Sequence, residues 1–170
     1  ISSLDEVRHG DVVIIRSHGE GKSFYDEAGE RGISLIDATC PFVAKIHKLV
    51  HDTDKQVVIV GDKDHPEVIG IFGWCRKPAI VVSRYDEAAA IESDDLFIVT
   101  QTTIREEVLQ EVVKALTDSG KTFYVNNTIC SATTKRQESC EKLAKESDLM
   151  IVIGGRKSSN TKKLCEISKK

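Results

Sequence analysis

Short runs of β-branched and other apolar residues recur along the chain, and helical patterns fill most of the gaps between them. Apolar runs of this length are typical of strands that are buried on both faces of a sheet. The clearest helical spacing covers residues 104–116 and 135–144, and Gly32 and Gly120 are placed to end helices. Strands that alternate with helices form parallel sheets through right-handed βαβ units, so the sequence predicts an α/β fold. The expected strands are residues 12–15, 33–36, 57–60, 79–82, 96–99, 122–125 and 149–153.

The chain also repeats itself with a period of about ninety residues. Segment 11–18 aligns with segment 95–102, and each copy leads through a helix and a further strand to a cysteine. These cysteines are Cys40 and Cys130, and the sequences after them match again. A repeat of this kind predicts lobes arranged around a pseudo-symmetry axis. We also expect that the chain is cut at both ends and that a further cysteine precedes residue 1 in the longer protein. The expected parts are the second half of a first lobe (1–39), a complete middle lobe (40–129) and the first half of a third lobe (130–170).

Composition excludes several classes of protein. With 40% hydrophobic and 30% charged residues, the 170-residue chain has the profile of a globular protein. A formal net charge of -3 offers no basic face for a phosphate backbone, so we expect no nucleic-acid partner. No apolar run approaches a membrane span and no leader is recognisable, so we expect no membrane contact and a cytoplasmic location. Five cysteines without a C-x-x-C pair argue against a disulfide framework or a zinc ribbon.

Polar and reactive residues follow the carboxyl ends of the expected strands. Ligands bind at this edge of a parallel sheet, where loops lead into helix N-termini. Hydroxyls, imidazoles and the free N–H groups of helix starts suit an anionic oxygen ligand such as a phosphate or diphosphate. The simpler interpretation is that Ser, Thr, Asn and Asp lie there because they cap helices. The residues are Ser17-His18-Gly19, Thr39-Cys40-Pro41, Asp64-His65-Pro66-Glu67, Thr100-Gln101-Thr102-Thr103, Thr128-Ile129-Cys130-Ser131 and Ser158-Ser159-Asn160-Thr161.

The two repeated cysteines are candidate metal ligands. Because Cys40 and Cys130 occupy equivalent places, a symmetric closure of the lobes would bring both sulfurs toward one point, as in an iron–sulfur or soft-metal site. Cysteine also often serves as a small buried hydrophobe, and that interpretation stays open. We predict a packing role for the cysteines that do not repeat, which are Cys75, Cys140 and Cys165.

The sequence His65-Pro66-Glu67 predicts acid–base chemistry. Pro66 at the first position of a helix would aim His65 and Glu67 into one cleft, where an imidazole orients a ligand and a carboxyl in dry surroundings supplies a proton. The alternative is a surface cap with an acid that the helix dipole favours. The remaining histidines, His9, His47 and His51, lack such neighbours and are expected to be solvated.

Taken together, these motifs resemble those of the IspH/LytB family, whose members are 4-hydroxy-3-methylbut-2-enyl diphosphate reductases of the non-mevalonate isoprenoid pathway. The resemblance covers essentially the whole chain, and the order of several motifs makes it specific. It implies a trefoil of three α/β lobes around a central cavity that holds a [4Fe–4S] cluster, with one cysteine ligand from each lobe. Cys40 and Cys130 match two of these ligands.

The resemblance also implies roles for individual residues. Glu67 matches the proton donor, which acts through Thr102 close to the hydroxyl of the allylic diphosphate substrate. His18 and His65 match histidines at the diphosphate and hydroxyl ends of that substrate, and Thr103 is a further candidate for the same site. The matches to the diphosphate-binding loop are Ser158, Ser159 and Asn160.

The family's electrons come from an external donor such as ferredoxin or flavodoxin. Its first cluster cysteine, an early histidine and a late serine have no counterpart in these 170 residues, so the chain alone is expected to lack full activity. Two alternatives stay open: a phosphate-binding α/β module whose thiols hold no metal, and a Cys–His hydrolase with one nucleophilic cysteine. The repeat argues against the hydrolase, because a nucleophile has no reason to recur at equivalent positions.

Overall fold

A computed structural model of the chain describes residues 3–156 and 158–169. Within this part the strands pair in parallel and form two sheets, which confirms the predicted α/β fold. A two-stranded sheet consists of β1 (Val12–Ile15) and β2 (Ser34–Asp37). A four-stranded sheet has the order β4-β3-β5-β6, and its strands are β3 (Gln56–Val60), β4 (Ile80–Val82), β5 (Leu96–Thr100) and β6 (Phe123–Val125).

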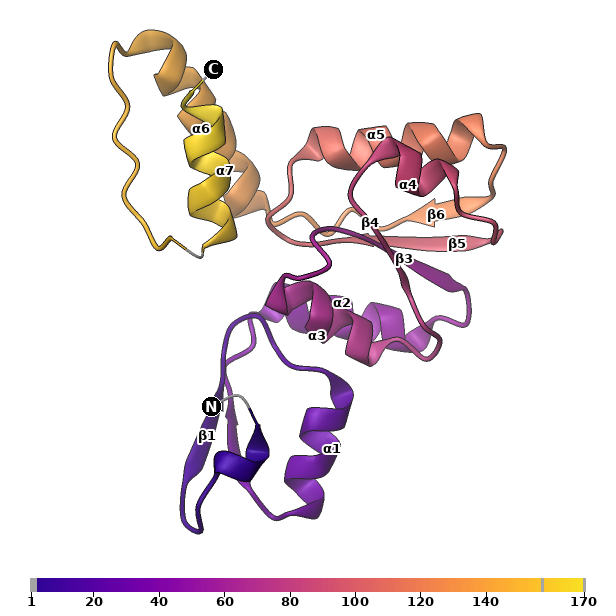
Figure 1. Cartoon of the computed structure of the whole chain (residues 1–170), viewed down its shortest axis with the longest axis vertical. Helices are drawn as coiled ribbons and strands as arrows, with labels where there is room; N and C mark the ends of the chain where they lie inside the picture. Colours follow the sequence, from indigo (N-terminus) through magenta and orange to yellow (C-terminus); the bar gives the residue numbers. More distant parts are fainter. Residues whose placement is uncertain (1–2, 157, 170) are drawn as a thin grey trace.

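Helices lie between successive strands, and two further helices follow the last strand. They are α1 (Lys22–Glu30), α2 (Pro41–Asp52), α3 (Pro66–Trp74), α4 (Tyr85–Ala89), α5 (Glu106–Asp118), α6 (Ser131–Glu146) and α7 (Ser159–Ile167), and a short 3₁₀ helix spans Leu4–Glu6. Helices α4 and α5 lie on one face of the four-stranded sheet, and α2 and α3 lie on the other (Figure 1). None of the described helices is long and apolar enough to cross a membrane.

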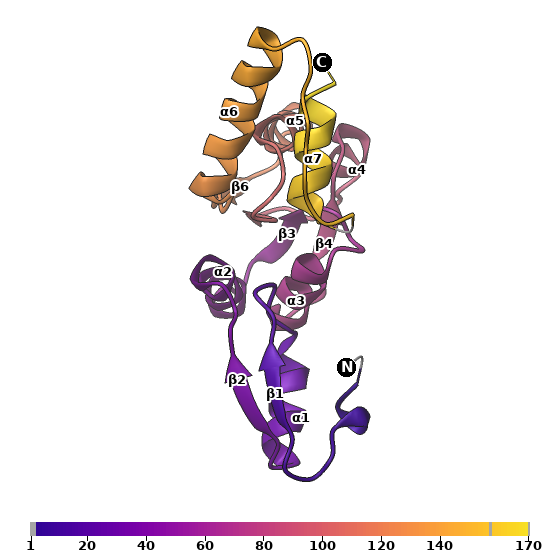
Figure 2. The ribbon, with the colours of Figure 1, turned by 90° about the vertical axis from the view of Figure 1, so that its left-hand side faces the viewer.

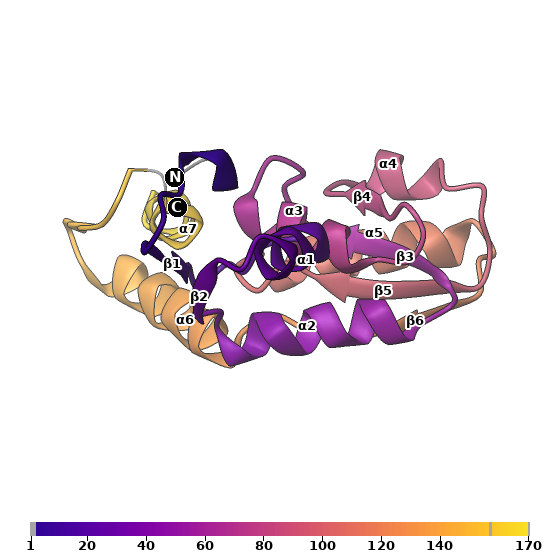
Figure 3. The same cartoon turned by 90° about the horizontal axis from the view of Figure 1, so that it is seen from below.

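The two ends of the chain flank the central sheet. Seen from the side, the β1–β2 sheet with α1 lies at one end of the molecule and the α6–α7 pair at the other, with α2 and α3 between them (Figure 2). Both groups lie on the side toward which β5 points (Figure 3). The carboxyl ends of the central strands, where ligands bind in parallel sheets, therefore face both neighbouring groups.

The last four residues of β3, Val57 to Val60, are apolar and buried on both faces of the sheet. Successive side chains of a strand point to opposite faces of the sheet. Val58 and Val60 pack into a cluster with residues of α4 and α5, whereas Val57 and Ile59 pack against residues of α2 and α3. The strand that leads into the candidate site is thus held from both sides.

The strand order creates a topological switch between β3 and β5. From β3 the chain passes through α3 to β4 on one side, and then through α4 to β5 on the other side. The loops after β3 and β5 diverge to opposite faces, and such a crevice is the usual ligand site of an open α/β sheet. Close approach of these loops explains Gly61, because a Cβ atom there would lie 2.9 Å from the Cβ of Gln101.

The glycines predicted to end helices do so. Gly32 and Gly120 follow α1 and α5 with φ angles of 64° and 67°, the left-handed conformation in which glycine has no steric penalty.

The predicted strand at residues 149–153 is wrong. No strand is assigned there, and Leu149, Ile151 and Ile153 are 78%, 77% and 92% exposed. An apolar run forms a strand only when a neighbour pairs with its N–H and C=O groups, and none of the described strands does so here.

Candidate functional site

Glu67 and Thr102 form the centre of the candidate site. Glu67 lies in the first turn of α3, directly after the loop that follows β3, and is only 3% exposed. Its carboxylate accepts hydrogen bonds from the backbone N–H of Thr102 at 2.6 Å and from the Thr102 hydroxyl at 2.8 Å. Burial raises the pKa of Glu67, although the two hydrogen bonds from Thr102 act in the opposite direction. A buried carboxyl joined to a hydroxyl is suited to hold and pass on a proton.

Two histidines lie beside this pair. Pro66 begins α3, and His65 before it caps the helix by accepting the N–H of Glu67 on Nδ1 at 3.2 Å, which leaves Nε2 to carry the hydrogen. The His18 ring meets the His65 ring edge to face, with 5.5 Å between centroids. Burial lowers the pKa of His65, and nearby His18 lowers it further. Nδ1 of His18 is buried without a hydrogen-bond partner among the described residues, as expected where a ligand supplies the partner.

Both repeated cysteines are helix N-cap residues, Cys40 of α2 and Cys130 of α6. Neither thiol makes a capping hydrogen bond, and both are free and half-buried. The backbone N–H of Cys40 donates to the carbonyl of Ser17 at 3.0 Å, and that of Cys130 donates to the carbonyl of Thr102 at 2.9 Å. Both cysteines therefore lie at the N-terminal, positive end of a helix dipole.

The other cysteines have the surroundings of packing residues. The Cys75 thiol donates to the carbonyl of Ile71 at 3.4 Å, and burial raises the pKa of Cys75 to about 11. Cys140 is 8% exposed, and Cys165 is half-buried on α7. None of the three begins a helix.

The start of α7 is hydrogen-bonded to the loop that follows β5. Ser158 caps α7 by accepting the N–H of Thr161 at 3.3 Å. The Thr103 hydroxyl donates to the Ser159 hydroxyl at 3.1 Å, although 56 positions separate the two residues. Oδ1 of Asn160 is buried and has no partner among the described residues. The α7 loop therefore presents polar groups toward the same crevice as Thr102.

These contacts connect the predicted site residues into one continuous series. It runs from Cys40 through the loop of His18 to His65, and then through Glu67 and Thr102 to Cys130, with Thr103 and the α7 loop as a branch. The described residues contain no group of three or more His, Cys, Asp or Glu side chains that could hold a metal ion.

Gln101, which the sequence places among the polar residues at the strand ends without a role of its own, connects two loops of the candidate site. It is 1% exposed, its Oε1 accepts the N–H of Asp62 at 3.0 Å, and its Nε2 donates to the Thr103 hydroxyl at 2.9 Å. It thereby fixes the loops after β3 and β5 relative to each other. Its position in the sequence could have indicated this role. Gln101 carries an amide directly after an apolar strand, and it aligns with Ser17 in the repeat.

The prediction that His47 is solvated is wrong. His47 is 5% exposed and stacks on Trp74, with 5.3 Å between ring centroids and 15° between ring planes. Burial lowers the pKa of His47 to about 4, although the negative charge of Asp37 acts to raise it. The spacing of α2 alone could not reveal this, because the covering ring belongs to the end of α3.

The buried His47 predicts a loss of stability in mild acid. Between pH 6.5 and about 4, the folded state binds fewer protons than the unfolded state, because buried His47 stays neutral. The contribution of neutral His47 to the free energy of unfolding is therefore complete above pH 6.5 and is lost as the pH falls toward 4. The full loss corresponds to about 3 kcal/mol. Urea unfolding at a series of pH values should show a steeper decline in the free energy of unfolding for the unchanged protein than for His47→Gln. Equal slopes would contradict the prediction.

Gly19, which follows His18, cannot carry a side chain. Its φ is 71°, and a Cβ atom would lie 2.5 Å from Cε1 of His47. We expect Gly19→Ala to lower the free energy of unfolding by about 1–3 kcal/mol more than Gly10→Ala does. The control is matched because Gly10 also has a positive φ, 90°, but no atom within 4 Å of its Cβ position. Denaturant unfolding of both variants measures the difference, and equal losses would show that no clash exists.

Fold and site together define a parallel α/β protein with polar side chains at its strand ends and a cysteine at each of two helix starts. The LytB protein family matches residues 1–170, and the chain belongs to this family. The match confirms the resemblance found in the motifs.

Relatives and solved structures agree with this assignment. The 4-hydroxy-3-methylbut-2-enyl diphosphate reductase of Alkaliphilus oremlandii (strain OhILAs) is 48% identical over 173 residues, which cover 99% of this chain and 62% of that protein. The protein of the same description from Clostridioides difficile (strain 630) is 43% identical over 173 residues, which cover 98% of this chain and 62% of its own length. This chain thus spans about three fifths of the length of these relatives.

The solved E-1-hydroxy-2-methyl-but-2-enyl-4-diphosphate reductase from Plasmodium falciparum superimposes with a TM-score of 0.90 at 31% identity, over 99% of this chain and 56% of that one. A solved (E)-4-hydroxy-3-methyl-but-2-enyl diphosphate reductase, described as the terminal enzyme of the non-mevalonate pathway, gives a TM-score of 0.73 at 44% identity, over 99% of this chain and 62% of that one.

Proposed function

We propose that this chain is the part of a 4-hydroxy-3-methylbut-2-enyl diphosphate reductase that carries the proton donor and much of the diphosphate site. The whole enzyme removes the hydroxyl of its substrate and yields isopentenyl and dimethylallyl diphosphate. The observation that carries the proposal is the buried Glu67–Thr102 pair, which adjoins His65 and is bonded through Thr102 to Cys130. Family membership and the descriptions of the relatives support the same activity.

The cofactor in this proposal is a [4Fe–4S] cluster. Cys40 and Cys130 suit two of its ligands because both thiols are free, half-buried and placed at helix N-termini. A further cysteine would come from the rest of the longer protein. When bound, the cluster supplies single electrons and a Lewis-acidic iron at the hydroxyl end of the substrate.

Glu67 and Thr102 move the proton that the reaction needs. The raised pKa keeps a proton on the Glu67 carboxyl at higher pH than in water. Protonated Oε2 of Glu67 then donates to Oγ1 of Thr102, and the Thr102 hydroxyl hydrogen turns toward the leaving hydroxyl of the substrate. One proton passes along this pair, and the hydroxyl leaves as water. Burial of both groups excludes bulk water from the relay.

Groups on three loops hold the diphosphate. His18 has a buried ring nitrogen without a hydrogen-bond partner among the described residues, and Asn160 would donate to the diphosphate through the N–H groups of its side-chain amide. Backbone N–H groups at the start of α7 favour negative charge. Together with Thr103 and the hydroxyls of Ser158 and Ser159, these groups orient the substrate so that its hydroxymethyl end meets His65 and Thr102.

The remaining expectations belong to the same proposal. Residues 1–39, 40–129 and 130–170 would be parts of the first, middle and third lobes of a trefoil in the whole protein. The electron donor would be a ferredoxin or flavodoxin, and the enzyme would act in the cytoplasm. The 170-residue chain alone, with two of the three cysteine ligands, would show no robust turnover.

The test uses the full-length protein that contains this chain, loaded with iron and sulfide under anaerobic conditions. Reduced methyl viologen supplies electrons, and mass spectrometry follows conversion of 4-hydroxy-3-methylbut-2-enyl diphosphate. Formation of the two product diphosphates supports the proposal, and no conversion by iron-loaded protein contradicts it. Diphosphate binding without iron would identify a phosphate-binding module, and cleavage of diphosphate without any reductant would identify a hydrolase.

A further inference from the structure

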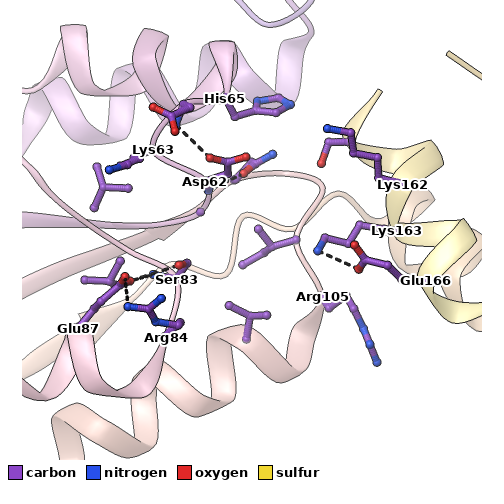
Figure 4. Close-up of a pocket in the computed structure, with 18 residues that line it drawn as sticks. Asp62, Lys63, His65, Ser83, Arg84, Glu87, Arg105, Lys162, Lys163 and Glu166 are labelled. Atoms are coloured by element: carbon purple, nitrogen blue, oxygen red, sulfur yellow. Dashed lines mark hydrogen bonds and ion pairs between the residues drawn. The ribbon is translucent and has the colours of Figure 1, made fainter. Parts of the chain in front are cut away.

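A cavity of about 690 Å³ adjoins the candidate site at the carboxyl ends of β3, β4 and β5 (Figure 4). His65, Gln101 and Ser159 line one side of it and so connect it to the crevice described above. Several charged residues line the remainder, among them Asp62, Lys63, Arg84, Arg105, Lys162 and Lys163.

Most of the cations around the cavity already have carboxylate partners. Arg84, Arg105 and Lys163 each lie within 4.0 Å of a carboxylate oxygen. Lys162 and Lys63 have no such partner in the part of the chain that the structure describes, and Figure 4 shows the Lys63 side chain extending away from Lys162. Among the described residues on the α7 side of the cavity, Lys162 is thus a cation whose charge is not paired with a carboxylate.

Lys162 is directed at the residues that we assign to the ligand. Its backbone N–H donates to the carbonyl of Ser158 at 3.1 Å, so it belongs to the first turn of α7. Its side chain extends from α7 toward His65 (Figure 4). Burial is the main reason for the lowered pKa of His65, and the charge of Lys162 acts in the same direction. An unpaired ammonium group beside an imidazole and a serine loop attracts an anion.

We propose that Lys162 is a further binding residue for the diphosphate, which its ammonium group approaches from the cavity side of the α7 loop. This inference rests on the proposed function and deepens it. The ammonium group adds a charge-assisted contact that the neutral serine and histidine side chains do not provide.

The test compares three variants of the full-length, iron-loaded protein. Calorimetry measures the affinity for inorganic diphosphate, and steady-state kinetics measure kcat and KM for the allylic diphosphate. We expect Lys162→Gln to weaken diphosphate binding and raise KM by roughly tenfold, with kcat within about twofold. Its KM should also depend less on ionic strength. Lys162→Arg keeps the charge and should restore KM to within about threefold.

Lys163→Gln is the matched control, because Lys163 is the next residue of α7 but is paired with Glu166 at 3.1 Å. Its affinity should stay within about twofold of the unchanged protein. The inference is overturned if Lys162→Gln binds diphosphate normally, if Lys163→Gln weakens binding equally, or if Lys162→Gln lowers kcat instead of raising KM. Failure of the proposed function looks different, since the unchanged protein would then show no reductase turnover at all.

Discussion

Full-length protein with Glu67→Gln is expected to lose about two to four orders of magnitude in kcat while it keeps its iron and its affinity for diphosphate. Glutamine has the shape of glutamate, its carbonyl can accept the N–H of Thr102, and its amide can donate to the Thr102 hydroxyl. The substitution therefore preserves the packing of this buried position and removes only the titratable proton. Turnover with reduced methyl viologen, measured beside iron content, gives the result.

The pH profile separates this role from a structural one. Because burial raises the pKa of Glu67, the acid form persists to higher pH, and the rate should decline as the pH rises through that value. Glu67→Gln has no such decline. Glu87→Gln is the control, since Glu87 also lines the cavity but pairs with Arg84 outside the series of site residues. A normal rate with an unchanged profile in Glu67→Gln would remove Glu67 from the mechanism.

Separate Cys40→Ser and Cys130→Ser changes in the full-length protein are each expected to lower iron affinity by at least about a hundredfold. A serine hydroxyl stays protonated and hard, whereas iron in a cluster requires a thiolate. Iron analysis and visible absorption after anaerobic loading measure the effect. Cys75→Ser should leave both unchanged, because the half-buried Cys75 has a pKa raised to about 11 and bonds a carbonyl of its own helix.

The pattern of losses decides among the alternatives. If only one of the two substitutions abolishes activity, and activity does not depend on iron content, that cysteine is a nucleophile and the cluster interpretation is wrong. If both variants keep their iron, the repeated cysteines are packing residues, and the cluster proposal fails.

Local sequence patterns were sufficient to predict the structure where a residue's neighbours in sequence are also its neighbours in space. The apolar run at residues 12–15 became β1 with the predicted bounds, and the helix ends at Gly32 and Gly120 follow from the freedom of glycine alone. The placement of Glu67 in a first helical turn likewise follows from Pro66.

Contacts between distant segments leave no pattern in the local sequence. His47 is buried because Trp74 covers it, and Gln101 is buried because it bonds the loop after β3. Residues 149–153 have the composition of a strand, but strand formation depends on a partner that no sequence pattern within the run specifies. The sequence carries no indication that Lys162 could bind a ligand, since an isolated lysine near a helix start is common on protein surfaces.

The backbone hydrogen bonds of the two cysteines restrict how such a protein can diversify. The backbone N–H of Cys40 is bonded to the residue before His18, and that of Cys130 to Thr102, so each cysteine is fixed to a loop that we propose to contact the substrate. An inserted or deleted residue in any of these loops would displace both a cysteine and a proposed substrate contact. Side chains there can be exchanged one at a time, but loop length cannot vary freely. Engineering a new substrate preference should therefore proceed by substitution, with insertions confined to the far ends of the strands.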